Sequence, residues 1–151
     1  MVRLQDIQNN EDIKALIEGA NKNLEVLGYT EHGIRHVTRV SETAARILRE
    51  LGYPNRLVEL AAIAGLMHDI GNCINRKNHG IAGANLLFPI LLKMKMPMED
   101  IVCIYASLDS LIEKCEFDDK RAELIMLLFE GNSVVDLEKY TSRKTRGNRW
   151  L

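Results

Sequence analysis

An apolar segment that ends in a histidine and an aspartate is the feature that most constrains how this chain folds. Residues 61–67 read Ala-Ala-Ile-Ala-Gly-Leu-Met, and the polar pair His68-Asp69 follows them directly, shortly before Gly71. A run this apolar belongs in a protein core, so an imidazole and a carboxylate should lie at the edge of that core. Neighbouring helix residues point about 100° apart, so both side chains can still converge on one ion at the helix rim. The segment therefore suggests a metal site.

The same pair also has a purely structural interpretation. His68 could cap the C-terminus of a helix, where the helix dipole favours a cation, and Asp69 could begin a turn that Gly71 completes. A histidine–aspartate pair in isolation does not discriminate between the two interpretations, because short motifs match by chance. The discrimination has to come from the rest of the chain.

The composition fits one helical domain. The 151 residues are 46% hydrophobic and only 5% aromatic, and 20 basic residues nearly balance 21 acidic ones. A chain of this length can bury a core without disulfides, and its three cysteines show no C-x-x-C spacing. The balanced charge argues against a nucleic-acid partner, and no apolar run approaches the length of a membrane span. We expect a soluble, cytoplasmic protein with no membrane partner.

Hydrophobic periodicity predicts helices along most of the chain, and hence an all-α fold. Apolar positions recur at helical spacing, and Gly, Pro or Asn marks the ends of most segments. We expect a single domain over residues 1–135, built as a bundle of about six to seven helices, and a basic tail over residues 136–151. The expected helices cover residues 10–27, 33–51, 54–71, 79–91, 98–111 and 122–129, and one short helix can follow residue 134.

Two histidines lie near the start of the second expected helix. Counted around that helix, His36 lies roughly 75° from the centre of the apolar stripe, and His32 lies about 40° further toward solvent. His36 can therefore face a partly buried cleft, whereas we expect His32 on the exposed side. A histidine at the border of a stripe is also compatible with ordinary packing, so His36 gains meaning only together with His68 and Asp69.

Three stretches together carry a family resemblance. Residues 31–40 read EHGIRHVTRV, residues 64–72 read AGLMHDIGN, and residues 75–84 read NRKNHGIAGA. In this combination the chain resembles the HD-domain superfamily of metal-dependent phosphohydrolases, in particular its small stand-alone members from bacteria and archaea. The resemblance implies an HD-type helical bundle with a divalent metal ion as cofactor. It implies that His36, His68 and Asp69 are three of the metal ligands, with a fourth, an aspartate, from a later helix.

The implied reaction is hydrolysis of a phosphomonoester or a nucleotide, which would be the small-molecule partner. A divalent ion polarises a phosphoryl oxygen and lowers the pKa of a bound water, and Asp69 can also orient that water. Imidazole and carboxylate ligands suit Mn, Fe, Co, Ni, Zn or Mg, so the residue types select none of them. Asp69 is therefore the expected catalytic residue.

A cationic loop follows the histidine–aspartate pair and leads into a helix. Arg76 and Lys77 stand in this loop, and a helix N-terminus beside two cations favours a phosphate group. Family members with a second metal use a histidine near the start of this helix, which makes His79 a further candidate. We expect Arg76, Lys77 and His79 to bind the substrate. A solvated basic loop is the alternative.

The resemblance weakens after Leu108, so the C-terminal third is divergent. Residues 106–111 contain no histidine where members with a fuller ligand set carry one, and residues 129–132 read Phe-Glu-Gly-Asn in place of an Ala-Asp ending. Glu130 is then the expected fourth ligand, with Asp136 as the second choice. The extra methylene of a glutamate displaces its carboxylate, so the helix would have to shift to restore the ligand distance.

Three functions are compatible with these observations. We rank a metal-dependent phosphohydrolase first and a degenerate HD domain that binds nucleotide or metal without turnover second, because the usual fourth ligand is missing. A helical bundle with core histidines ranks third. The oligomeric state stays open: three methionines near Pro97 could support a homo-oligomer as a soft apolar surface, although core packing is their commoner use. These methionines are Met94, Met96 and Met98.

Overall fold

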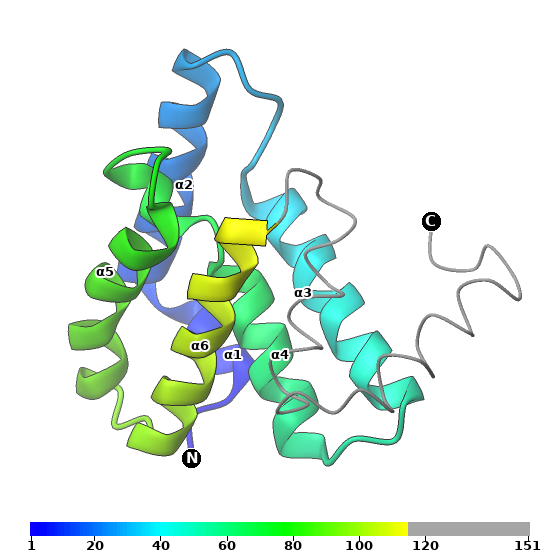
Figure 1. Ribbon diagram of the computed structural model, residues 1–151. Coiled ribbons are helices and arrows are strands. Elements are labelled where there is room, and N and C mark those ends of the chain that lie inside the picture. Colours follow the sequence, from blue (N-terminus) through cyan, green and yellow to red (C-terminus); the bar gives the residue numbers. More distant parts are fainter. Residues whose placement is uncertain (115–151) are drawn as a thin grey trace, which may run out of the picture.

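The structure is a computed structural model and describes residues 1–114. Six α-helices and one short 3-10 helix occur in this range (Figure 1). No strand occurs in this range, so the predicted all-α fold is confirmed. The helix expected over residues 122–129, any later helix and the basic tail lie outside the described residues. In chain order the elements are α1 (Leu4–Asn9), α2 (Glu11–Val26), α3 (Ile34–Glu50), α4 (Asn55–Met67), η1 (Ile70–Cys73), α5 (His79–Lys93) and α6 (Met98–Lys114).

Two features of this order differ from the sequence-based expectation. The short helix α1 was not predicted, because six residues show too little periodicity; its start is fixed by the Arg3 N–H, which donates to Asp6 Oδ2 at 2.8 Å. Helix α4 ends at Met67, earlier than the expected end at Gly71. His68 and Asp69 therefore lie at the junction between α4 and η1 rather than inside a last helical turn.

Helix α4 is the central helix of the domain. Every residue from 60 to 70 is buried, which explains why this stretch is apolar on all faces. Helix α3 packs along it through its apolar stripe. The sequence pattern also predicts Ile34 in this stripe, but Ile34, the first residue of α3, is 58% exposed. The two helices approach closely at Gly65, where a Cβ atom would lie 2.9 Å from Ser41 Cα. This contact brings the start of α3 near the end of α4.

The short helix η1 joins the central helix to α2 and α5, and it contacts both. Asn23 of α2 donates to the carbonyl oxygens of Asn72 and Cys73 at 3.0 and 2.9 Å. On the other side Gly71 lies directly against the first turns of α5, because a Cβ atom on Gly71 would lie 1.5 Å from His79 O and 2.6 Å from Gly83 N. Only a glycine allows this approach.

Helix α6 lies between α4 and α5 (Figure 1) and contacts both. Tyr105 donates to the carbonyl oxygen of Ala84 in α5, and Arg56 of α4 pairs with Asp100 of α6. Of the three methionines near Pro97, Met96 is buried and packs in the core, whereas Met98 is exposed. None of the described helices is both long enough and apolar enough to cross a membrane.

Two glycine contacts should be sensitive to a single added methyl group. We expect Gly65→Ala to lower the free energy of unfolding by about 1–3 kcal/mol, and Gly71→Ala by at least that much, because overpacked backbone contacts have to open. Gly19→Ala is the matched control: its Cβ would meet the Cys73 sulfur at 3.2 Å, a side chain that can move. Urea unfolding followed by circular dichroism measures all three. Wild-type stability of the Gly71 variant would contradict this account of the η1–α5 contact.

Candidate metal centre

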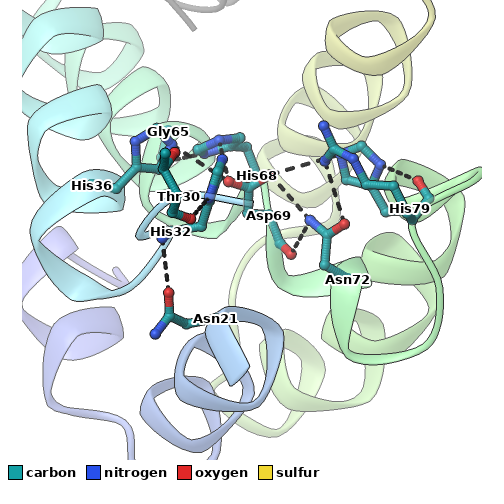
Figure 2. Close-up of polar contacts among 10 residues, drawn as sticks. Asn21, Thr30, His32, His36, Gly65, His68, Asp69, Asn72 and His79 are labelled. Atoms are coloured by element: carbon teal, nitrogen blue, oxygen red, sulfur yellow. Dashed lines mark hydrogen bonds and ion pairs between the residues drawn. The ribbon is translucent and has the colours of Figure 1, made fainter. Parts of the chain in front are cut away.

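The carboxylate of Asp69 is the centre of the polar cluster. It is buried, and its Oδ2 lies 3.0 Å from His68 Nε2 and 3.4 Å from His36 Nε2. Its other oxygen, Oδ1, lies 3.7 Å from His79 Nε2. Figure 2 shows His36 and His32 on one side of Asp69, and Asn72 and His79 on the other. The structure thus brings together the three residues that the sequence pattern selected as metal ligands, and places His79 beside them.

His32 also belongs to this cluster, which corrects the expectation that it faces solvent. It is only 6% exposed, and its ring centre lies 4.9 Å from that of His36. His32, His36 and Asp69 each offer one potential ligand atom, and these three atoms lie within 4.8 Å of one another. The helical projection misplaced His32 because the residue precedes α3, which begins at Ile34. Its backbone N–H instead donates to Asn21 Oδ1 at 2.8 Å, and this bond helps to hold it inside the domain.

Three of the four histidines are oriented by the same type of contact. Their Nδ1 atoms lie 2.5, 2.7 and 2.9 Å from backbone carbonyl oxygens for His32, His68 and His79, respectively. A carbonyl can only accept, so each Nδ1 carries the hydrogen, and in the neutral ring Nε2 presents its lone pair. Metal-binding histidines are commonly oriented in this way. The carbonyls belong to Thr30, Gly65 and Arg76.

The electrostatics of the cluster favour a bound cation. Neutral Nε2 lone pairs that face a carboxylate oxygen repel it, and His36 Nε2 is buried without a hydrogen bond among the described residues. A buried polar atom left without a partner costs about 1–3 kcal/mol. One divalent cation between these atoms would neutralise Asp69 and give the imidazole lone pairs a partner. The donor set therefore fits a divalent metal ion.

The remaining predicted site residues lie at different distances from this cluster. Arg76 is half-buried, and its Nη1 lies 3.4 Å from Asn72 Oδ1. Asn72 in turn donates to Asp69 Oδ1 at 3.2 Å, so Arg76 is connected to the centre. Lys77 is exposed and is not part of these contacts. Glu130 and Asp136 lie outside the described residues, and their role as a fourth ligand stays a prediction.

Asn72 was missed by sequence reasoning, although a signal was present. It follows Asp69 by three residues within the same tight segment, the spacing at which a side chain can reach back over a 3-10 turn. Its amide donates both to the Asp69 carbonyl at 2.9 Å and to the Asp69 carboxylate. It thereby holds the orientation of the central carboxylate.

The comparison with family models agrees with the metal-site interpretation of the histidine–aspartate pair. The model of the HD domain matches residues 33–130, well over half of the chain. The chain belongs to the HD domain family. Neither the curated proteins nor the solved structures gave a match. The matched range extends beyond Leu108, where the motifs quoted above become weak, and ends at Glu130.

A divalent metal should stabilise this HD domain. With Mn²⁺ at 100 times its dissociation constant, we expect the free energy of unfolding to rise by about 2.7 kcal/mol, because the ion binds the folded state alone. Asp69→Asn should lose this increment, since it removes the negative charge at the centre. Asp12→Asn, an exposed site on α2, should keep it. Thermal unfolding with Mn²⁺ and with a chelator measures the difference, and an equal increment in both variants would contradict the site.

Proposed function

We propose that this HD domain is a metal-dependent phosphohydrolase that acts on a phosphomonoester or a nucleotide. The main support is the convergence of imidazole Nε2 atoms on the buried Asp69 carboxylate, within the segment that matches the family. A divalent ion held there would polarise a phosphoryl oxygen and lower the pKa of the attacking water. Family membership alone would not support the activity, since a fold can lose its chemistry and keep its shape.

The two oxygens of Asp69 would have different roles. Oδ2 faces His36 and His68 and would join them as a metal ligand. Oδ1 is held by the Asn72 amide and faces His79, so it can accept a proton from a water molecule on that side. This division follows the general requirement that a catalytic base be fixed within hydrogen-bond reach of the proton it removes.

The metal site would have enough protein ligands even without one from the C-terminal third. Catalytic metal sites commonly use three protein ligands and keep a position open for water or substrate. His36, His68 and Asp69 supply three, and His32 lies close enough to His36 and Asp69 to add another. Glu130 would then complete or strengthen a site whose main parts lie between residues 32 and 69.

Arg76 is the cation best placed to bind the phosphoryl group. Its guanidinium contacts Asn72 and lies 5.0 Å from the centre of the Tyr29 ring, so the side chain is held near the metal centre. A fixed guanidinium can donate two parallel hydrogen bonds to a phosphate. The exposed Lys77 would add long-range attraction for an anion, which salt screens.

Binding without turnover is the second candidate. It is favoured by one observation, the lack of a histidine in residues 106–111. A domain of this kind would still take up metal and phosphate at Asp69, and would form no product.

Metal-dependent hydrolysis of a generic aryl phosphate tests the first proposal. With Mn²⁺ or Co²⁺ we expect turnover, and we expect His36→Gln and Asp69→Asn to lower kcat/KM by about 100-fold or more, beyond the effect typical of residues that only support a ligand. Arg35→Ala is the control, since Arg35 stands next to His36 but is exposed and paired with Glu31. Metal-dependent phosphate binding without product would favour the second candidate. Turnover that survives Asp69→Asn would reject the first.

The contributions of His32 and Glu130 can be separated by metal affinity. We expect His32→Gln to weaken Mn²⁺ binding about 10- to 100-fold, because it removes an imidazole that the Thr30 carbonyl orients toward the cluster. Glu130→Gln should have a comparable effect if the predicted fourth ligand is correct. Isothermal titration calorimetry on both variants measures each contribution. Unchanged affinity in His32→Gln would assign that residue to packing.

A further inference from the structure

A cavity of about 500 Å³ lies between the end of α2 and the segment that follows Asp69. Val26 and Leu27 line it from α2, and Ile74 lines it from the opposite segment. Asn72 and Arg76 also line it. Its volume is within the range of small-molecule sites. The cavity is therefore large enough to hold an organic group of the size of a fused ring system.

The cavity is linked to the metal centre by the hydrogen bonds of two of its own lining residues. Asn72 donates to the Asp69 carboxylate, and Arg76 contacts the Asn72 side chain from the cavity side. A second connection runs through aromatic rings: Arg76 lies over Tyr29, and the Tyr29 ring packs edge-on against His32 at 6.4 Å between centres. Arg76 thus lies at the border between the cavity and the metal centre.

The lining of the cavity indicates what it can accept. Val26, Leu27 and Ile74 are large apolar side chains that remain exposed to solvent, although they come from two separate segments. Apolar side chains gathered in this way mark a binding surface more often than scattered ones do. Among the described residues, Arg76 is the one charged side chain that lines the cavity and no acidic side chain does, while amides come from Asn23, Asn72 and Asn75. A cationic group would therefore find no carboxylate among these residues, whereas an uncharged apolar group would bury Val26, Leu27 and Ile74.

We infer that this cavity binds the organic group of the substrate, and that the substrate is a phosphomonoester of an uncharged, largely apolar ring system. The inference rests on the proposed function. The phosphoryl group lies at Asp69 and Arg76, and the ester group extends past Asn72 to contact Leu27 and Ile74. The apolar contacts favour ring-bearing esters, since a ring buries Leu27 and Ile74, and a small polyhydroxylated group offers no apolar surface to them.

Two esters and two variants test the selection. We expect kcat/KM with Mn²⁺ to be higher for 1-naphthyl phosphate than for glycerol 3-phosphate by about 10-fold or more. Leu27→Asp and Ile74→Asp each place a carboxylate in the cavity, and each should lower kcat/KM much more for 1-naphthyl phosphate than for glycerol 3-phosphate and so remove most of this preference. Val102→Asp on α6 is the control, because Val102 is exposed to the same degree as Leu27, 59% against 60%, and does not line the cavity.

A binding measurement separates failure of this inference from failure of the proposed function. Calorimetry with Mn²⁺ should show that 1-naphthylmethylphosphonate binds more tightly than methylphosphonate, and that Leu27→Asp abolishes the difference. Tight naphthyl binding without hydrolysis of either ester would support the cavity and reject the enzyme. Hydrolysis of both esters at similar kcat/KM, unaffected by Leu27→Asp, would overturn the inference and leave the enzyme standing. If neither ester is hydrolysed and neither phosphonate binds, the inference and the proposed function are both overturned.

Discussion

The contact between Gly71 and the first turns of α5 fixes the geometry on which the site depends. Because the η1 backbone lies against His79 and Gly83 with no room for a Cβ atom, α5 has to start beside the end of α4. That start carries His79, and the end of α4 carries His68 and Asp69. A backbone contact of this kind fixes position more firmly than side-chain contacts do, since backbone atoms have no rotamers to change. The cluster is therefore built by packing, before any ligand binds.

The same arrangement buries the carboxylate of Asp69 in the core, where a charge does not favour folding. Asp69 is buried just after the central helix α4, and a buried carboxylate is costly unless it is paired. Two of its imidazole neighbours, His68 and His79, have Nδ1 atoms already occupied by backbone carbonyls, so their Nε2 atoms oppose a carboxylate rather than donate to it while they are neutral. If Asp69 were only a structural polar group, the neighbouring imidazoles would be expected to direct their N–H groups toward its carboxylate. The observed orientation suits a cation, and it links metal binding to stability.

Sequence reasoning could predict much of this and had identifiable reasons to miss the rest. The long helices follow from apolar periodicity, and His36 could be placed at a border because it lies within a regular helix, where angles can be counted. His32 could not, because its position depends on the bend before α3 and on the hydrogen bond that its backbone N–H donates to Asn21 Oδ1 in α2. Likewise α1 was too short to show a period, and the end of α4 depends on the long-range contact of Gly71. Glu130 illustrates a further limit: a ligand on a divergent segment is a guess from spacing, and it stays a prediction.

The two sides of Asp69 show how one residue can organise both binding and chemistry. On the Oδ2 side the neighbours are imidazoles from α3 and from the end of α4, a rigid pair of helices in close contact at Gly65. On the Oδ1 side the neighbours are Asn72 and the first residue of α5, next to a loop with exposed residues. The side enclosed by α3 and α4 suits a metal, which tolerates little displacement of its ligands, and the side next to the exposed loop suits a substrate, which has to enter and leave. Specificity would then reside in the loop and the end of α2, where substitutions leave the metal ligands in place.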